Sequence, residues 1–191
     1  MSKKKLKKYY ARFYKTGEFR KIEAENEDEA YKIIDDCVYA TLSCLDDEGG
    51  IFSVPISVAR GKGELAKSVF IHGALSGSKA RLFRAGRVVT LVAVASANVP
   101  ILSKQELNSM QTSELGSKVF TTEYKSAIAS TKAYEISAPN AKIQALRVLC
   151  EKYTPEYMSR FDEAANDALA HTAIWELKIT QISAKAKIIK P

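Results

Sequence analysis

The sequence predicts a mainly β protein: an antiparallel β-barrel with helices between and after its strands. About six segments alternate in polarity or are rich in β-branched residues, as half-buried strands are. Turns rich in Gly, Asn and Asp separate the first strands without long intervening helices, which favours antiparallel pairing over a parallel, doubly wound sheet. With 191 residues, 46% of them hydrophobic, the chain can bury a sizeable single core.

The first half of the predicted barrel is a helix followed by a hairpin, a strand and a second helix. Residues 26–37, NEDEAYKIIDDC, begin with Asn, carry acids in the first turn and place apolar residues at helical spacing. Two alternating runs then flank the turn DDEGG and predict a hairpin. Pro55 in its second strand predicts an edge, a bulge, or a place where something other than a strand approaches. The expected ranges are strands at 39–46, 51–60 and 68–73 and a helix at 76–86.

The second half continues with strands and helices up to the C-terminus. Residues 87–97 are almost continuously apolar, which is typical of a strand buried on both faces. Residues 98–123 show no strand signal beyond a possible short helix, and loops of this length are usually functional or mobile. The remaining ranges are a strand at 124–137, a helix at 139–153 that starts with Pro139, a further helix at 156–170 and a last strand at 172–188.

The positive charge is concentrated at the N-terminus. Residues 1–21 contain nine Lys or Arg and one acid, whereas the rest of the chain contains 20 basic and 21 acidic residues. We therefore expect a basic, aromatic-containing extension over residues 1–24 and one domain over residues 25–191. Aromatics between the charges suit RNA or an anionic surface, but a solvated tail or an added strand explains the same pattern. The nearly neutral body gives no reason to expect nucleic-acid binding there.

Several classes of chemistry lack support in the sequence. The chain has two histidines, His72 and His171, and three cysteines without metal-like or redox-pair spacing, so no metal site is expected. No hydrolase elbow, phosphate-binding loop or dinucleotide fingerprint is present. No apolar run is long enough for a membrane helix or a secretory signal, and a reduced, cytoplasmic protein is expected. If the protein is an enzyme, an organic cofactor is expected to supply its chemistry.

The stretch VFIHGALSGSKARLF (residues 69–83) predicts a strand that runs into a helix. The helix start SGSK offers Ser hydroxyls, a close backbone approach at Gly77 and the charge of Lys79, all of which suit a phosphate. The same residues also make an ordinary helix cap. His72 ends an apolar strand, where it is either a satisfied histidine or a functional one.

The order of these motifs resembles the nitroimidazole-resistance proteins of the FMN-binding split-barrel superfamily, relatives of pyridoxamine 5'-phosphate oxidase. The resemblance covers about residues 25–188. It rests on Val54-Pro55, Phe70-Ile71-His72-Gly73-Ala74, Gly77-Ser78-Lys79, Tyr124-Lys125-Ser126, Glu151-Lys152-Tyr153-Thr154-Pro155 and the final ITQISAK.

The resemblance implies a six-stranded antiparallel split barrel that forms a homodimer and binds FMN at the subunit interface. It places one strand beside the flavin ring, a second along the ring and ribityl chain, a phosphate site at the following helix and a contribution from the neighbouring subunit. In that order, these cofactor-binding residues are Ser53, Val54, Pro55 and Ile56; Ile71, His72 and Gly73; Ser78 and Lys79; and Tyr124, Lys125 and Ser126.

The resemblance also implies an activity, that of an FMN-dependent oxidoreductase which passes electrons from a nicotinamide donor to a small acceptor such as a nitroaromatic. His72 would be the catalytic residue, which orients an anionic substrate or donates a proton. Ser53 and Ser78 stand where the oxidase branch has arginines, which argues against pyridoxamine-phosphate oxidation. Two alternatives remain open: a non-catalytic flavin- or haem-binding barrel, and a nucleic-acid or anionic-surface binder acting through the basic tail.

Overall fold

The computed structural model describes residues 9–10, 21–22 and 27–189. Most of the predicted N-terminal extension therefore lies outside the described residues, and its proposed binding role stays a prediction. Two short strands are described there, β1 (Tyr9–Tyr10) and β2 (Lys21–Ile22), which pair with each other in antiparallel register. β1 lies against the long C-terminal strand of the domain.

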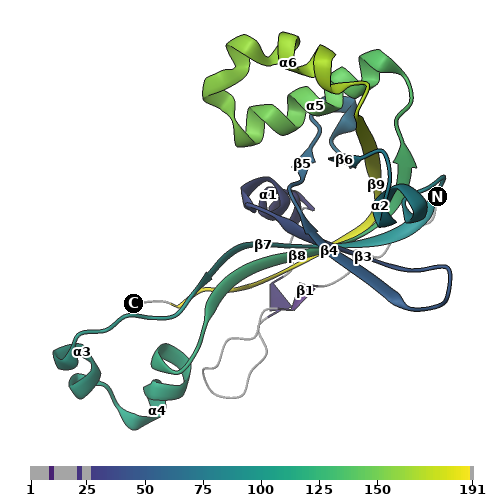
Figure 1. Cartoon of the computed structure of the whole chain (residues 1–191). Helices are drawn as coiled ribbons and strands as arrows, with labels where there is room; N and C mark the ends of the chain where they lie inside the picture. Colours follow the sequence, from purple (N-terminus) through teal and green to yellow (C-terminus); the bar gives the residue numbers. More distant parts are fainter. Residues whose placement is uncertain (1–8, 11–20, 23–26, 190–191) are drawn as a thin grey trace, which may run out of the picture.

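The domain is built on one antiparallel sheet of seven strands, as the mainly β prediction requires (Figure 1). Neighbouring strands follow the order β4-β3-β7-β8-β9-β6-β5. Their bounds are β3 (Ala40–Leu45), β4 (Ile51–Ile56), β5 (Ala59–Arg60), β6 (Ser68–Ala74), β7 (Arg87–Asn98), β8 (Glu123–Glu135) and β9 (Thr172–Lys187).

The strand count is seven instead of the expected six because the run 51–60 is interrupted. It forms β4, a break at Ser57 and Val58, and the short β5, which pairs with β6 instead of β3. Pro55 lies in β4, at one end of the strand order, which confirms the predicted edge position. An edge strand tolerates proline because only one side of its backbone must take part in the ladder.

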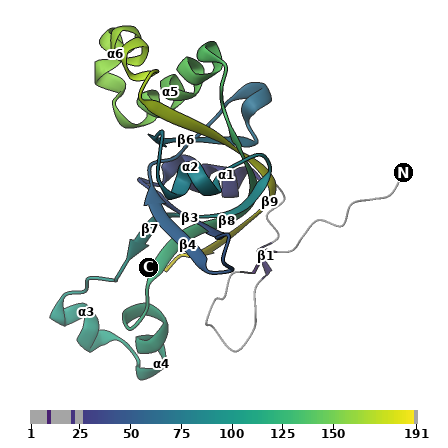
Figure 2. The same cartoon turned by 45° about the vertical axis from the view of Figure 1, so that its right-hand side comes forward.

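The helices cover parts of the sheet and leave much of its outer face open. Their bounds are α1 (Asp28–Asp36), α2 (Ser78–Leu82), α3 (Lys104–Ser109), α4 (Thr112–Glu114), α5 (Pro139–Tyr153) and α6 (Phe161–Ala168), with 3-10 turns at Gly63–Leu65 and Pro155–Arg160 and a π-helical turn at Leu115–Val119. α5 and α6 lie together over β5 and β6, whereas α3 and α4 sit at the tip of an arm formed by the far ends of β7, β8 and β9 (Figures 1 and 2).

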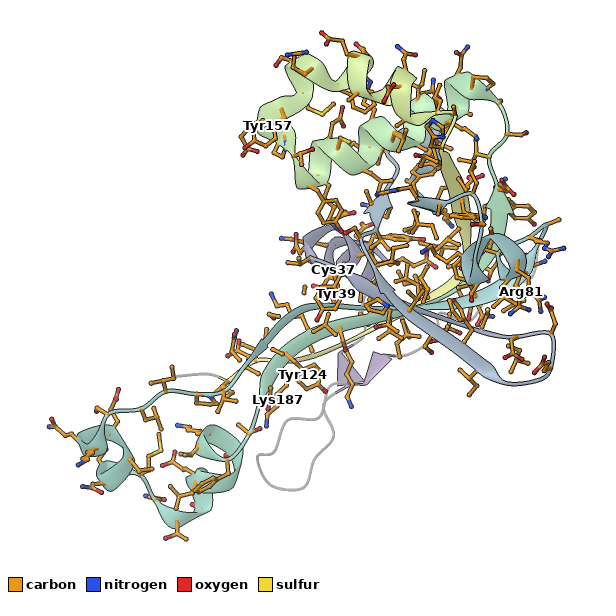
Figure 3. The ribbon with its side chains drawn as sticks, viewed as in Figure 1. Cys37, Tyr39, Arg81, Tyr124, Tyr157 and Lys187 are labelled. Atoms are coloured by element: carbon orange, nitrogen blue, oxygen red, sulfur yellow. The ribbon has the colours of Figure 1, made fainter. Side chains whose placement is uncertain are left out.

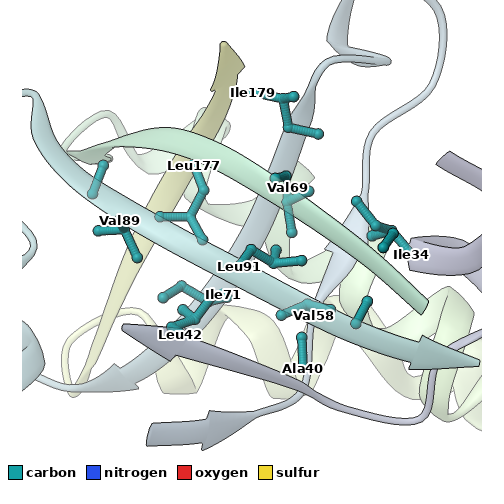
Figure 4. Close-up of a cluster of buried hydrophobic side chains, with 14 of the residues drawn as sticks. Ile34, Ala40, Leu42, Val58, Val69, Ile71, Val89, Leu91, Leu177 and Ile179 are labelled. Carbon is teal, nitrogen blue, oxygen red and sulfur yellow. The ribbon is translucent and has the colours of Figure 1, made fainter. Parts of the chain in front are cut away.

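The main core lies between α1 and the inner face of the sheet. Ile34 of α1 belongs to the same buried cluster as Leu42, Ile71, Leu91 and Leu177 from four different strands, all of them fully buried (Figure 4). A second, smaller cluster packs α5 and α6 against the opposite face of β6. Strand β6 therefore has apolar contacts on both faces, and its residue alternation decides which core each side chain enters.

Strand β7 corrects one expectation. Only alternate residues of β7 face the core: Val89, Leu91 and Ala93 are fully buried, while Val88 is 61% exposed and Val94 is 47% exposed. Residues 87–97 are almost continuously apolar, yet the core covers only one face of this strand in the antiparallel sheet. The exposed valines belong to an open outer face of the sheet.

Candidate cofactor site

The two strands singled out by the motifs belong to the same sheet, and each has a free edge. β4 is at one end of the strand order and, among the described residues, pairs only with β3. β6 is the last strand but one: it pairs with β9 along its length but with the short β5 only at Val69 and Phe70. From Ile71 to Ala74, the outer edge of β6 therefore has no strand partner in the described part of the chain. We call these two free edges together the seam, and each of them one border of it. Ser53–Ile56 lie on one border and Ile71–Gly73 on the other.

On β4, the predicted residues alternate between the core and the outside. Val54 and Ile56 pack against the main core, whereas Ser53 and Pro55 are exposed on the outer face. The Ser53 hydroxyl is 2.8 Å from the Ser43 hydroxyl on β3, and one donates to the other. The outer side of this strand thus offers hydroxyl oxygens and a proline, with no charge.

At the other border, Lys79 lies directly over Gly73. A Cβ added to Gly73 would lie 2.6 Å from Cε of Lys79 and 3.2 Å from its Nζ, so this position requires glycine for the lysine to lie where it does. No carboxylate lies within ion-pair distance of Lys79 among the described residues. Ser78 is exposed at the first position of α2, after Gly77 with its positive φ of 99°. A half-buried cation without an anionic partner is a suitable group to bind a phosphate.

His72 and Ile71 point to opposite sides of β6. The Ile71 side chain is fully buried in the main core, so only its backbone is open at the strand edge. His72 is exposed on the other face, and partial desolvation, together with the nearby charge of Lys79, lowers the pKa of its imidazole. Near neutral pH the ring is therefore neutral, and it can both donate and accept a hydrogen bond.

The third predicted group, Tyr124, Lys125 and Ser126, is not brought to the seam within one chain. These residues lie on the arm, where Lys185 Nζ is 5.8 Å from the Tyr124 ring centroid and the Ser126 hydroxyl donates to the Lys185 carbonyl. Figure 3 shows Tyr124 and Lys187 on the arm, well away from Arg81 of α2. If they contribute to the same cofactor site, a second copy of the chain must supply them.

The middle of the outer face of the sheet carries uncharged side chains. It has two rows of directly paired residues across β4, β3, β7 and β8: Ser53, Ser43, Thr90 and Ser130 in one, and Pro55, Thr41, Val92 and Ile128 in the other. A groove of about 430 Å³ continues the second row, between the start of β3 and the end of β7. The sequence analysis did not identify the residues that β3 and β7 contribute to these rows, although the polarity alternation of residues 39–46 was a signal for those on β3.

The structure also gives two findings on metals and membranes. The described residues contain no group of three or more His, Cys, Asp or Glu side chains that could hold a metal ion. Within the same residues, no helix is long and apolar enough to cross a membrane.

Comparisons with known proteins agree with this architecture. A family model described as pyridoxamine 5'-phosphate oxidase matches residues 26–186. The protein is thus a split barrel of the FMN-binding type, and the chain belongs to the pyridoxamine 5'-phosphate oxidase family. No curated protein sequence is significantly similar to it.

Solved structures share the fold at low sequence identity. A candidate 5-nitroimidazole antibiotic resistance protein from Bacteroides thetaiotaomicron has a TM-score of 0.61 and 17% identity, with 84% of this chain and 83% of that chain covered. An FAD and heme binding protein from Mycobacterium smegmatis has a TM-score of 0.64 and 22% identity, with 87% and 73% covered. The flavocytochrome Anf3 from Azotobacter vinelandii has a TM-score of 0.63 and 19% identity, with 87% and 69% covered.

Proposed function

We propose that this protein binds FMN at the seam and is an oxidoreductase that passes electrons from a nicotinamide donor to a small acceptor such as a nitroaromatic. The observation that carries the proposal is the position of Lys79, which lies over Gly73 at the border of the seam without an anionic partner among the described residues. Membership of a family named for an FMN-dependent oxidase supports the choice of cofactor.

The residues present fit this cofactor. Lys79 and Ser78 would bind the phosphate, and the uncharged side chains and open backbone edges of β4 and β6 would border the ring. FMN supplies the capacity to accept and release electrons. The protein's part is to bind and orient. His72 would hydrogen-bond the acceptor as a neutral imidazole and would transfer a proton to it from the protonated form of the ring, whose pKa is lowered.

A homodimer is part of the proposal. Within one chain the Tyr124–Ser126 segment lies on the arm, and the outer face leaves Val88, Val94 and Ile128 between 47% and 61% exposed. A second copy packed on this face would cover those side chains and bring its arm toward the seam. We also place the protein in the cytoplasm, since Cys37, Cys44 and Cys150 are all free thiols.

A non-catalytic haem-binding protein is the second candidate. It is favoured by His72, because an exposed, neutral imidazole is the form that ligates haem iron. The descriptions of two fold neighbours mention heme or a flavocytochrome, which makes this ligand worth testing.

The absorption spectrum of the purified protein, with added FMN and then with added haem, separates these candidates. Retained flavin bands followed by bleaching with NADH or NADPH support the oxidoreductase, whereas a Soret band without flavin binding supports the second candidate. Lys79→Ala should weaken FMN binding by about 1–3 kcal/mol, the range for a charge-assisted contact. Lys62→Ala, at an exposed turn lysine, is the matched control. Equal affinities in both variants would contradict the phosphate site.

A further inference from the structure

The break between β4 and β5 is held by one tyrosine hydroxyl. Tyr153, the last residue of α5, accepts a hydrogen bond from the Val58 backbone N–H at 3.0 Å and donates one to the Val58 carbonyl at 2.9 Å. The Val58 side chain is fully buried in the main core. Both backbone groups of this residue are thus bonded to a single side-chain group that lies 95 positions away in the sequence.

Lys152 reinforces the same point. Its Nζ donates to the Val58 carbonyl at 2.9 Å and to the Ile34 carbonyl near the end of α1 at 3.0 Å, and it lies 3.9 Å from the Cys37 sulfur. The ammonium group is half-buried, and this desolvation lowers its pKa. Lys152 therefore connects the ends of α1 and α5 to the break. We call Lys152 and Tyr153 together the clamp.

The location of the clamp matters because β4 is held from one side only. Its ladder to β3 ends at the pair Ala40 and Ile56, and Val58 follows two residues later. Beyond Ile56, no strand in the described part of the chain pairs with this segment until β5 pairs with β6 at Ala59. The clamp therefore holds the residue at which the chain passes from the end of β4 to β5, the strand that pairs with β6.

We propose that Tyr153 and Lys152 are positioning residues for the cofactor site, which set the place of strand β4 at the seam by holding the backbone of Val58. This inference rests on the proposed function, because it names residues that act on the FMN site without touching the cofactor. Packing alone does not explain the arrangement, since a phenylalanine would fill the same space as the tyrosine ring. The hydroxyl is needed because the buried Val58 N–H must be bonded and the Tyr153 oxygen is its acceptor, whereas the Val58 carbonyl has a second donor in Lys152.

The test compares Tyr153→Phe with a variant that loses a similar bond elsewhere. Thr131→Val is the matched control, because the Thr131 hydroxyl is also buried and donates to the Val89 carbonyl at 2.8 Å, within the central β7–β8 ladder and away from the seam. Lys152→Met, which keeps the aliphatic stem, is a second variant if Tyr153→Phe fails to fold. Three quantities are measured on the full chain: the melting temperature, the Kd for FMN, and the hydrogen-exchange rate of the Val58 amide.

We expect Tyr153→Phe to raise the Val58 exchange rate and the FMN Kd by about tenfold or more each, as for loss of a buried hydrogen bond. Thr131→Val should lower the melting temperature about as much as Tyr153→Phe does. It should leave the Val58 exchange rate and the FMN Kd within about twofold of their values in the unmodified protein, because distant sites act independently. Unchanged exchange and Kd in Tyr153→Phe would overturn the inference, and so would an equal rise of Kd in Thr131→Val. If the unmodified protein does not bind FMN, the proposed function fails instead, and the exchange rate alone shows whether the clamp holds Val58.

Discussion

Replacing Gly73 with alanine should weaken FMN binding while leaving the stability of the fold almost unchanged. The new Cβ would lie 2.6 Å from Cε of Lys79, a distance at which one of the two atoms must move. The lysine side chain is the part that gives way, because its far end is flexible. The Trp175 ring, at 3.4 Å from the new Cβ, lies at an ordinary contact distance. The perturbation therefore moves a cofactor-binding group and leaves the core in place.

Two opposing contributions set the size of the stability change. Alanine restricts the unfolded chain more than glycine does, which stabilises the fold by about 0.4–1 kcal/mol where the backbone conformation allows it. Moving the lysine costs a comparable amount, so we expect a net change within about 1 kcal/mol. Losing a charge-assisted contact to phosphate costs about 1–3 kcal/mol, which is a factor of about 5 to 150 in the Kd for FMN.

The assay is a fluorescence titration of FMN beside a thermal melt for four proteins: the unmodified chain, Gly73→Ala, Lys79→Ala and the double variant. Because both changes act through the same ammonium group, the double variant should bind FMN no more weakly than Lys79→Ala alone. Gly61→Ala is the opposite control: its Cβ would lie 2.6 Å from the Leu65 carbonyl oxygen, so it should destabilise the fold without a specific effect on FMN. Unchanged affinity in Gly73→Ala, or additive losses in the double variant, would refute the reasoning.

Three further predictions concern charge, chemistry and the core. Hydrogen bonds from Arg87 and Arg81 hold the pKa of Asp47 below its ordinary 3.8. The stabilising contribution of this carboxylate is therefore present above pH 3.8 and is lost as the pH falls through its lower pKa in the folded state. The difference in melting temperature between the unmodified protein and Asp47→Asn should shrink below pH 3.8. If His72 donates the proton, turnover should fall as the pH rises through a pKa below 6.5, and His72→Gln should lower turnover about 100-fold or more without changing the FMN Kd; equal turnover would exclude this role. Trp175 is fully buried and its indole N–H has no partner among the described residues, so Trp175→Phe should cost less than about 3 kcal/mol in a denaturant titration, because it also removes an unsatisfied donor.

Local patterns predicted most of the elements correctly. The helix at 139–153 has the bounds of α5, and the strands expected at 68–73 and 172–188 differ from β6 and β9 by one residue. These elements were predictable because side-chain periodicity and Pro139 act within a few residues of each other. The helix expected at 76–86 is shorter, Ser78–Leu82, since Phe83 leaves helical geometry to enter the core.

The candidate site was predictable only in part. Order and type of the motifs indicated Pro55, His72 and Lys79 as members of one site. The sheet places Pro55 on its edge strand β4 and His72 on the part of β6 that lies beyond its pairing with β5. Which side of a strand each residue faces depends on register. The register separates His72 from Ile71, whose side chain lies in the core. The outer-face partners Ser43 and Thr90 could not be found without knowing which strands pair.

The sequence by itself determined most of the local elements and the family of the protein, because each depends on residues close together in the chain or on their order. Only the tertiary structure decided that the run 51–60 breaks at Val58, since the hydroxyl that holds it comes from Tyr153. It also decided that Lys79 lies over Gly73. Such contacts join residues from different elements, and their geometry exists only once the sheet has closed around its core.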